Sequence, residues 1–454
     1  MKNFKGARWL LVMLAALLAV GLTAFAAGCG DDEDTTSSGA APVTPATPST
    51  GGASSSTAAP SSSAAETTGG GETLKIVSDL PLQGASGAQT TQMVKAITYY
   101  LNEIAQNKAG NYTIQYESKD DSTASAGKWD PAKCTANAEE YAADESIVGV
   151  IGTFNSGCAQ IEIPILNEAG VAMISPANTG VGLTHAGPGS EPGEPDKYYP
   201  TGTRNYARVV ASDDFQGAAA AQFAQQLGVK KLYIMHDNET YGKGVAEATA
   251  LAAKKLGIEV VGPEPYDPKA SDYTSTFNAV KGVDGVFIGA IIDNNGAKVV
   301  KDKVSVLGDN TKVKLFGPDG MLVEDLPKDA GPAAEGMYLS VPGSPASEIQ
   351  GPAKELLDKV QQAVGGKLEV YTSYGIQAAQ ALLKAIENSD GSRESVVENL
   401  LQVNIPADQS ALGRDITFDE NGDVPFKDIS FSVVKGSEIN YDQTVTPDAA
   451  LLEE

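Results

Sequence analysis

Two short polar loops carry hydroxyl groups directly after apolar runs of the sequence. The first is 152–158, Gly-Thr-Phe-Asn-Ser-Gly-Cys, which follows the apolar run 147–151. The second is 175–180, Ser-Pro-Ala-Asn-Thr-Gly, which follows 171–174. We expect Ser156 to be the N-cap of a helix, where free backbone N–H groups and the positive helix end attract a carboxylate or a phosphate. The alternative is that Ser156 is a structural cap alone.

Strands and helices alternate along the segments that would position these loops. Apolar or alternating runs predict strands, and apolar residues three and four positions apart predict helices. The predicted strands are 74–77, 112–116, 147–152, 171–174, 231–235, 258–261, 285–289 and 313–316. The predicted helices include 93–104, 136–143 and 218–227. Such alternation is typical of doubly wound parallel α/β sheets, whose ligands bind beyond the carboxyl ends of the strands. We therefore expect the two polar loops to converge, and a chain of this length to form two lobes.

The first residues have the features of an export signal. Basic residues within the first eight positions precede an apolar stretch, 9–22, that is shorter than the roughly 20 residues of a membrane-spanning helix. Small residues at 26–28 then lead into Cys29, in a pattern similar to the lipobox of bacterial lipoproteins. This resemblance implies a signal peptide over 1–28 and a lipid on Cys29. An ordinary signal peptide followed by a chance cysteine is the alternative.

Residues 29–72 differ in composition from the rest of the chain. They are rich in Ser, Thr, Ala, Pro and Gly and contain almost no large apolar side chain. Such a segment cannot bury enough surface to offset its chain entropy. We expect a flexible linker that tethers a folded part to the lipid anchor on the extracytoplasmic face of the membrane.

The charge of the chain excludes several partners. The sequence has 58 acidic and 33 basic residues, a formal net charge of −25. A nucleic-acid partner would need a basic surface, so none is expected. His185 and His236 are the only histidines, which leaves little for a histidine-rich metal site. We expect no metal and no cofactor, and a small or zwitterionic ligand.

The sequence gives little support to catalysis. It contains no G-x-S-x-G, H-E-x-x-H, G-x-x-x-x-G-K or G-x-G-x-x-G motif. Asp120 and Asp121 could be imagined as an acid/base pair of a secreted hydrolase, which is a remote alternative. Adjacent residues of a strand point to opposite faces, so we expect the two to cap a strand end instead. The prediction is that the protein is not an enzyme.

Ten short segments in a fixed order carry a family resemblance. They are 150–152, 167–171, 173–176, 197–200, 204–208, 216–217, 236–237, 241–244, 317–320 and 335–337. In this order they resemble the type I periplasmic-binding-protein fold, in particular the branched-chain amino-acid (Leu/Ile/Val) binding proteins of ABC importers. The resemblance covers about 74–434, essentially the whole globular part.

The resemblance implies roles for residues in the polar loops and in the second lobe. Donors in the two loops would hold the ligand α-carboxylate, while Asp319 would receive the α-ammonium and Tyr241 would close over the ligand. Charge-assisted hydrogen bonds suit such a zwitterion. The alternatives are a Pro-Asp-Gly turn for Asp319 and a surface Tyr-Gly turn for Tyr241. The implied ligand residues are Phe154, Asn155, Ser156, Ala177, Asn178, Thr179, Tyr241 and Asp319.

The resemblance also implies an architecture and a partner. Two doubly wound lobes would be joined by three hinge crossings, near Ala211, Val341 and Pro425. Lobe one would comprise 73–210 and 343–425, lobe two 211–342 and 426–445, and a tail 446–454. The implied protein is a monomer that captures a small aliphatic amino acid and delivers it to an ABC importer permease. A receptor subunit that senses a ligand, and a binder of another small solute, are the alternatives.

The loop 290–296 departs from the family pattern. It reads Ala-Ile-Ile-Asp-Asn-Asn-Gly, where leucine-binding relatives carry tyrosines. Ile291 and Ile292 cannot stack or donate as tyrosines would, so the ligand side chain stays open. The Gly- and Pro-rich stretch 187–195 is an inserted loop without an expected role.

Two cysteines remain if Cys29 carries a lipid. Cys134 and Cys158 form an even pair in an exported protein. Members of the family often bridge these two loops, so the resemblance implies a disulfide. Zinc, the alternative, lacks a nearby histidine or further cysteines.

Overall fold

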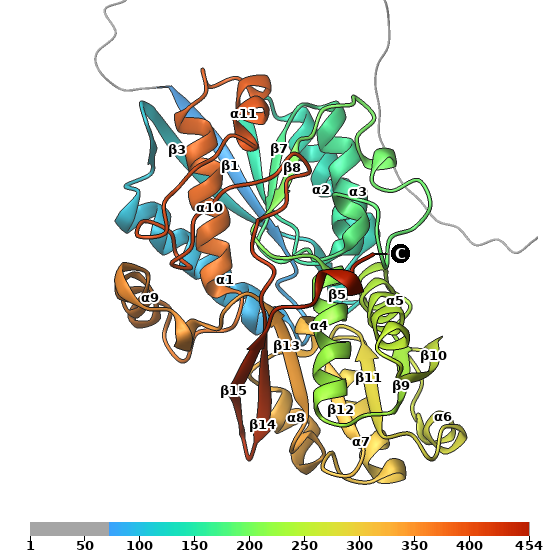
Figure 1. Cartoon of the computed structure of the whole chain (residues 1–454). Helices are drawn as coiled ribbons and strands as arrows, with labels where there is room; N and C mark the ends of the chain where they lie inside the picture. The colour runs from blue at the N-terminus through green and yellow to red at the C-terminus, as the bar shows by residue number, and fades with distance from the viewer. Residues whose placement is uncertain (1–71, 454) are drawn as a thin grey trace, which may run out of the picture. The chain divides into compact units, whose positions relative to one another are not determined.

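The first of two main sheets has six strands in the order β2-β3-β1-β6-β7-β8 (Figure 1). The computed structural model describes residues 72–453. The strands of this sheet are β1 (Thr73–Leu80), β2 (Lys108–Ala109), β3 (Tyr112–Asp120), β6 (Ile147–Gly152), β7 (Ala172–Ser175) and β8 (Tyr206–Arg208). All neighbours pair in parallel except β2 with β3. Consequently β6 and β7 end at the same edge.

The second sheet has seven strands in the order β10-β9-β11-β12-β13-β14-β15. Its strands are β9 (Lys231–His236), β10 (Glu259–Pro265), β11 (Gly285–Gly289), β12 (Lys314–Gly317), β13 (Tyr338–Pro342), β14 (Ile429–Lys435) and β15 (Glu438–Val445). Pairing is parallel as far as β13, and β14 and β15 add an antiparallel edge. A separate hairpin joins β4 (Ser122–Thr123) to β5 (Lys128–Trp129).

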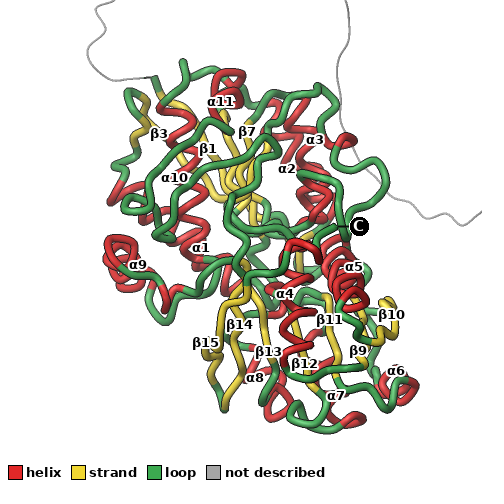
Figure 2. The backbone as a smooth tube through the Cα atoms, viewed as in Figure 1, coloured by secondary structure: helices red, strands yellow, loops and turns green. Residues whose placement is uncertain are grey.

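Helices cover both faces of the first sheet (Figure 2). They are α1 (Gly87–Tyr99), α2 (Pro131–Ala143), α3 (Ser156–Glu168), α9 (Gly351–Val364), α10 (Thr372–Glu387) and α11 (Arg393–Leu400). Successive strand residues point to opposite faces. Accordingly Ile76 belongs to the core built with α1 and α10, whereas Val77 belongs to the core built with α2 and α3.

The second sheet is covered in the same way. Its helices are α4 (Asp213–Gln226), α5 (Thr240–Lys255), α6 (Thr274–Ala279), α7 (Gly296–Leu307) and α8 (Leu326–Ala330). Ile234 packs in a core with α4 and α5, while its neighbour Tyr233 packs in the core that contains α6, α7 and α8. Each sheet with its helices is one lobe, and the two-lobe α/β fold is confirmed.

Several local predictions are corrected by the structure. The sheets are mixed rather than wholly parallel, because hairpin-connected edge strands are added to a parallel centre. The helix expected at 93–104 begins at Gly87 and ends in a π-helical turn, Tyr100–Ile104. Ser156 is not an N-cap: Asn155 occupies that position and α3 begins at Ser156. The expected lobe limits and hinge crossings stay predictions.

A buried arginine connects three distant segments of the chain. The Arg208 guanidinium donates to Asp423 Oδ1 at 2.5 Å, and to the carbonyl oxygen of Gly180 at 2.7 Å. The side chain of His185 lies between Asp423 (2.9 Å) and Asp214 (3.5 Å). These contacts tie the loop after β7 to the start of α4 and to the segment before β14.

His185 should make the stability of the protein depend on pH. Burial alone would lower the pKa of His185, but the hydrogen bonds to Asp214 and Asp423 outweigh it and raise that pKa to about 9. The unfolded value is about 6.5. The stabilisation is therefore complete below about pH 6.5 and is lost as the pH rises through about 9.

We expect His185→Gln to remove the stabilisation that protonated His185 gives to the folded state, which is on the order of 3 kcal/mol at most. Thermal unfolding of wild type and variant from pH 6 to 10 measures it. The gap between the two unfolding midpoints should narrow as the pH rises. If the difference between the two midpoints stays constant from pH 6 to 10, the prediction is wrong.

Candidate ligand-binding site

A small cavity lies between the two lobes, at the ends of the central strands. The first lobe contributes the loops that follow β6 and β7, and the second lobe contributes the segments that follow β9, β11 and β12. Its lining residues are Phe154, Asn155, Ser156, Ala177, Tyr241, Ile291, Asp319 and Gly320. Loops at the carboxyl ends of parallel strands converge here, as such sheets require.

The first-lobe side of the cavity presents hydrogen-bond donors. The first turn of α3 has N–H groups without an intrahelical partner. The Ser156 hydroxyl accepts a hydrogen bond from the backbone N–H of Gly180 at 3.1 Å, which joins the two polar loops. The Thr179 hydroxyl is buried and has no hydrogen-bond partner among the described residues. This side suits a carboxylate.

Trp129 packs beside the start of α3. A Cβ atom at Gly157 would lie only 2.6 Å from the Trp129 ring, so a glycine is needed there. The Trp129 indole N–H also donates to Glu239 of the second lobe at 2.9 Å. The hairpin that carries Trp129 therefore connects the first turn of α3 to the opposite lobe.

Asp319 is the acidic group of the cavity, and three side chains donate to it. Gln216 Nε2 and the Tyr241 hydroxyl donate to Asp319 Oδ1 at 2.5 and 2.7 Å. The Tyr371 hydroxyl, at the end of the first lobe's segment before α10, donates to Oδ2 at 2.7 Å. Burial raises the pKa of Asp319 above its ordinary value, although these three donors act in the opposite direction.

A second carboxyl group, Asp213, lies beside Asp319. Gln216 Nε2 also donates to Asp213 Oδ1 at 3.0 Å, so one amide bridges the two acids. Asp213 Oδ2 has no hydrogen-bond partner among the described residues. Burial, and then the charge of Asp319, raises the pKa of Asp213 well above its ordinary value. Neither acid forms an ion pair within residues 72–453, and two such buried acids favour a positively charged ligand group.

The site has two poles: the donor side in the first lobe and the acid pair Asp213 and Asp319. They meet at Thr179. The backbone N–H of Asp213 donates to the carbonyl oxygen of Thr179 at 2.8 Å. The two side-chain groups that lack a partner, the Thr179 hydroxyl and Asp213 Oδ2, therefore lie on hydrogen-bonded neighbours. A ligand with both a carboxylate and an ammonium would satisfy them together.

One predicted ligand residue points elsewhere. The Asn178 side chain donates to the Thr153 hydroxyl at 3.3 Å and accepts from the Tyr206 hydroxyl at 3.1 Å. The backbone carbonyl oxygen of Asn178 accepts from Arg208 at 3.3 Å. The structure thus places the Asn178 side chain in the interior of the first lobe, whereas the other predicted residues lie at or beside the cavity.

The remaining wall of the cavity is apolar. Ile291 replaces the tyrosines expected from the family, and it lies with Phe154 and Ala177 in the lining. The Phe154 ring meets Tyr371 edge-on, with ring centroids 5.7 Å apart. This wall offers dispersion contacts and no hydrogen-bond donor of its own.

Several contacts across the lobes surround the site. Lys128 forms an ion pair with Glu239 and donates to Asn294 Oδ1 at 2.7 Å. The Thr240 hydroxyl donates to Gln160 at 2.9 Å. The inserted loop 187–195, to which no role was assigned, contributes Glu191, which pairs with Lys243 of α5. The lobes are thus held together around the cavity.

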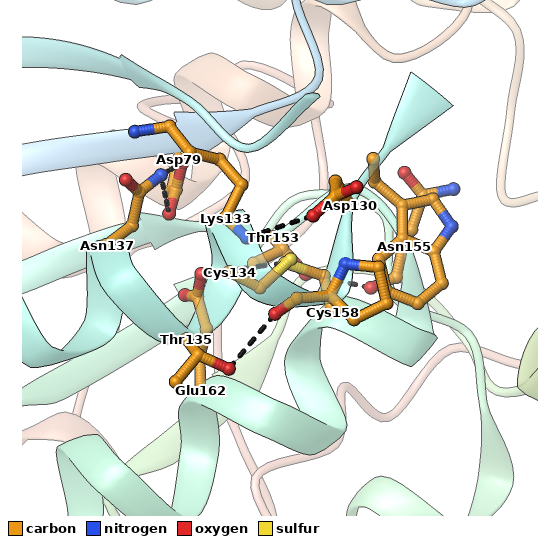
Figure 3. The surroundings of a disulfide bond; sticks show 12 residues. Asp79, Asp130, Lys133, Cys134, Thr135, Asn137, Thr153, Asn155, Cys158 and Glu162 are labelled. Atoms are coloured by element: carbon orange, nitrogen blue, oxygen red, sulfur yellow. Dashed lines mark hydrogen bonds between the residues drawn. A yellow bond between two sulfur atoms is a disulfide. The ribbon is translucent and has the colours of Figure 1, made fainter. Parts of the chain in front are cut away.

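A disulfide joins Cys134 of α2 to Cys158 in the first turn of α3 (Figure 3). Their Cα atoms are 5.7 Å apart. The bond fixes the loop that contains Asn155 and Ser156. Because both sulfurs are in the disulfide, neither is a thiolate ligand for zinc.

The expected signal peptide, the linker and Cys29 lie outside the described residues. Within residues 72–453, no helix has the length and apolar character needed to cross a membrane. Of the residues that complete the site, the sequence predictions did not include Asp213, Gln216 and Tyr371. Gln216 was part of the family pattern, but nothing local pointed to the other two.

Comparisons with known proteins identify relatives over the same region. A Leu/Ile/Val-binding protein homolog of Brucella suis is 26% identical over 350 residues, which are 76% of this chain and 85% of that protein. The leucine-binding protein of Thermotoga maritima is similar in structure, with a TM-score of 0.70, 22% identity and coverage of 83% of this chain and 99% of that one.

A further solved structure has another ligand. It is a solute-binding protein of an ABC transporter from Rhodopseudomonas palustris, in complex with p-hydroxybenzoic acid. The TM-score is 0.69 at 19% identity, with coverage of 83% of this chain and 98% of that one. At these identities the solved structures establish a shared fold.

The family model described as "Periplasmic binding protein" matches residues 73–438, well over half of the 454 residues. The match contains both sheets as far as the start of β15, and every residue that lines the cavity. This chain belongs to the periplasmic binding protein family, whose members bind solutes and are not enzymes.

Proposed function

We propose that this protein captures a free amino acid with a small aliphatic side chain and delivers it to the permease of an ABC importer. The observation that supports the ligand class most strongly is the pair Asp213 and Asp319, two buried acids that share one amide donor. An α-ammonium group placed between them would neutralise charge that the described residues leave without a cationic partner.

The opposite pole would bind the α-carboxylate. The hydroxyl of Thr179 is a donor without another described partner, and the N-terminus of α3 beside it favours a negatively charged group. The distance between the two poles is short, since Asp213 and Thr179 are joined by a backbone hydrogen bond of 2.8 Å. An α-amino acid carries its two charged groups at a comparably short separation.

An aromatic carboxylic acid is the main competing ligand. The relative from Rhodopseudomonas palustris binds such an acid. A benzoate has a carboxylate but no ammonium group, so it would leave both Asp213 and Asp319 buried without a counter-charge. Truncating or omitting one partner of a buried charged pair costs several kcal/mol. The acid pair therefore favours the amino acid.

The apolar wall would select the side chain. Phe154, Ala177 and Ile291 can contact methyl groups, and none can donate a hydrogen bond from its side chain. A buried polar side chain without a partner is unfavourable. Valine, isoleucine, leucine and alanine are the amino acids that this wall accommodates at least cost.

Closure of the lobes would present the bound form to the permease. The contacts of Glu239 with Lys128 and Trp129, and of Glu191 with Lys243, all require the two lobes to be close together. Hinge closure around a ligand is the usual way in which such lobes signal occupancy to a partner. The importer would then distinguish the loaded protein from the empty one.

The anchor belongs to the same proposal. Lipidation of Cys29 would hold the protein at the extracytoplasmic face of the membrane, on a linker formed by residues 29–72. We expect the mass of the mature protein to equal that of residues 29–454 plus a diacylglyceryl group. A mature protein without added lipid, or with Cys29 removed, would exclude the anchor.

A ligand screen tests the proposed function. The purified protein is unfolded, dialysed to remove bound solute and refolded, and its thermal midpoint is measured with each common amino acid and with p-hydroxybenzoate. A ligand at about a thousand times its dissociation constant adds roughly 4 kcal/mol, which is a shift of several degrees. We expect an aliphatic amino acid to give the largest shift. A shift with the benzoate and none with any amino acid would contradict the proposal.

A further inference from the structure

The loop between β11 and α7 reaches from the second lobe to the first. It is the segment 290–296, whose sequence departs from the family pattern. Ile291 lines the ligand cavity, but Asp293 and Asn294, which follow closely, do not belong to its lining. Both of these polar side chains have partners in the first lobe instead.

The carboxylate of Asp293 lies at the start of α1. Its Oδ1 atom accepts a hydrogen bond from the backbone N–H of Ser86 at 3.1 Å, and its Oδ2 atom accepts from the Ser86 hydroxyl. Ser86 directly precedes α1 and does not cap the helix with its own side chain, and the first turn of α1 contains no acidic residue. A carboxylate of the second lobe thus occupies the end of the helix at which negative charge is favourable.

The first lobe leaves just enough room for this carboxylate. Gly84 has a φ of +92°, and a Cβ atom there would overlap Asp293 Oδ1 and the carbonyl oxygen of Gly127. Gln89, in the first turn of α1, donates to the carbonyl oxygen of Leu322 of the second lobe at 3.2 Å. The second lobe therefore covers the start of α1 at two points.

Asn294 connects the same loop to the hairpin of the first lobe. Its Oδ1 atom accepts from Lys128 at 2.7 Å, and its Nδ2 atom donates to Glu239 Oε1 at 2.8 Å. Glu239 in turn accepts from the Trp129 indole. One loop thus contributes Ile291 to the ligand cavity and two polar side chains to the contact between the lobes.

The contact between Asp293 and Ser86 exists only while the lobes are together. Both hydrogen bonds that the Asp293 side chain makes within residues 72–453 go to the first lobe. When the lobes separate, the carboxylate and its donors return to water. The contact therefore stabilises the closed form and is not needed for the fold of either lobe.

We propose that Asp293 is a positioning residue for closure, which sets the affinity for the solute by holding the lobes together and does not touch the solute itself. This inference rests on the proposed function in one respect, namely that a solute closes the lobes. It is independent of the chemical class of that solute, because Asp293 lies outside the cavity lining. Hydrogen bonds to a charged group are stronger than those between neutral groups, so this contact should have a measurable effect on release.

The rate of solute release from Asp293→Ala tests this proposal. The probes are the common amino acids and, separately, p-hydroxybenzoate. Trp129 is the only tryptophan within residues 72–453 and it bonds across the lobes, so its fluorescence in a stopped-flow experiment reports closure and opening.

We expect the dissociation rate constant of the bound probe to rise about tenfold in Asp293→Ala, which is the magnitude for the loss of hydrogen bonds to a charged group. The association rate constant should change little, because the contact forms only after the solute has bound. Asp293→Asn keeps an oxygen acceptor and should show a smaller rise.

Asp272→Ala is the matched control. Asp272 Oδ1 accepts from the backbone N–H of Thr274 at 2.7 Å and from its hydroxyl at 2.5 Å, at the start of α6. This is the same kind of contact, but it lies within the second lobe, so its loss should leave the dissociation rate constant at the wild-type value. Ser86→Ala tests the contact from the opposite lobe, and its effect and that of Asp293→Ala should be less than additive in the double variant.

Three outcomes would overturn the proposal. The first is a dissociation rate constant in Asp293→Ala that equals the wild-type value. The second is an equal rise in Asp293→Ala and Asp272→Ala, which would indicate general destabilisation. The third is a wild-type protein that no probe closes. Closure by p-hydroxybenzoate alone, with faster release from Asp293→Ala, would contradict the proposed amino-acid ligand and still support the role of Asp293.

Discussion

Replacing Asp319 with alanine is expected to weaken amino-acid binding by more than tenfold while the fold stays intact. The substitution removes the carboxylate that would receive the ligand ammonium, and it leaves Asp213 as the only acid at that pole. Loss of one partner from a buried, hydrogen-bonded charge pair costs about 2–5 kcal/mol, and 2 kcal/mol already corresponds to roughly thirtyfold. Calorimetric titration with the amino acid found in the screen measures the change.

The substitution should lower stability without preventing folding. It leaves the donors of Gln216, Tyr241 and Tyr371 without their acceptor, at about 1–3 kcal/mol for each donor that stays unpaired. Asp329→Ala is the matched control, since Asp329 is an exposed acid of the same lobe without a described side-chain hydrogen bond. Unchanged affinity in Asp319→Ala, measured at a temperature where the variant is folded, would remove Asp319 from the site.

The position of the site could be predicted from the sequence because parallel strands impose it. Once 147–152 and 171–174 are strands of one sheet, the loops that follow them must share an edge. The structure accordingly brings Phe154, Ser156 and Ala177 together. The prediction therefore depended on the order of strands and not on any single motif.

Side-chain direction within the loops could not be predicted in the same way. Asn178 and Thr179 are neighbours, but Asn178 turns inward because Thr153 and Tyr206 offer it hydrogen bonds. Ser156 looked like a cap from its place before an apolar helix, yet its hydroxyl accepts from Gly180, 24 residues along the chain. Such contacts depend on tertiary neighbours that periodicity does not reveal.

Asp213 and Tyr371 could not be predicted as site residues, because nothing in the sequence around them requires a ligand. An aspartate in the first turn of a helix, such as Asp213, usually interacts with the helix dipole and needs no ligand to justify it. Tyr371 precedes a helix of the other lobe and reaches Asp319 only when the lobes are together. The contact made by the loop 187–195 could not be predicted for the same reason. Its residue Glu191 pairs with Lys243, which belongs to the opposite lobe.

Replacing Cys134 and Cys158 together with serine is expected to lower the free energy of unfolding by about 3–4 kcal/mol. The two residues are 24 positions apart, and the chain-entropy model gives this magnitude for a loop of that length. Denaturant unfolding of the wild type and the double variant measures the difference. With a reductant, the free energy of unfolding of wild type should fall toward that of the variant. The free energy of unfolding of the variant should not change with the reductant. A loss below 1 kcal/mol would contradict the estimate.

The same double variant separates stability from ligand recognition. Cys158 lies in the first turn of α3, but the loop before it is also held by the packing of Trp129 on Gly157 and by the bond from Gly180 to Ser156. These contacts remain when the disulfide is absent. We therefore expect the double variant to bind its amino acid within a fewfold of wild-type affinity at a temperature where both are folded. A large loss of affinity would mean that the disulfide, and not these contacts within the first lobe, positions the loop that would bind the carboxylate.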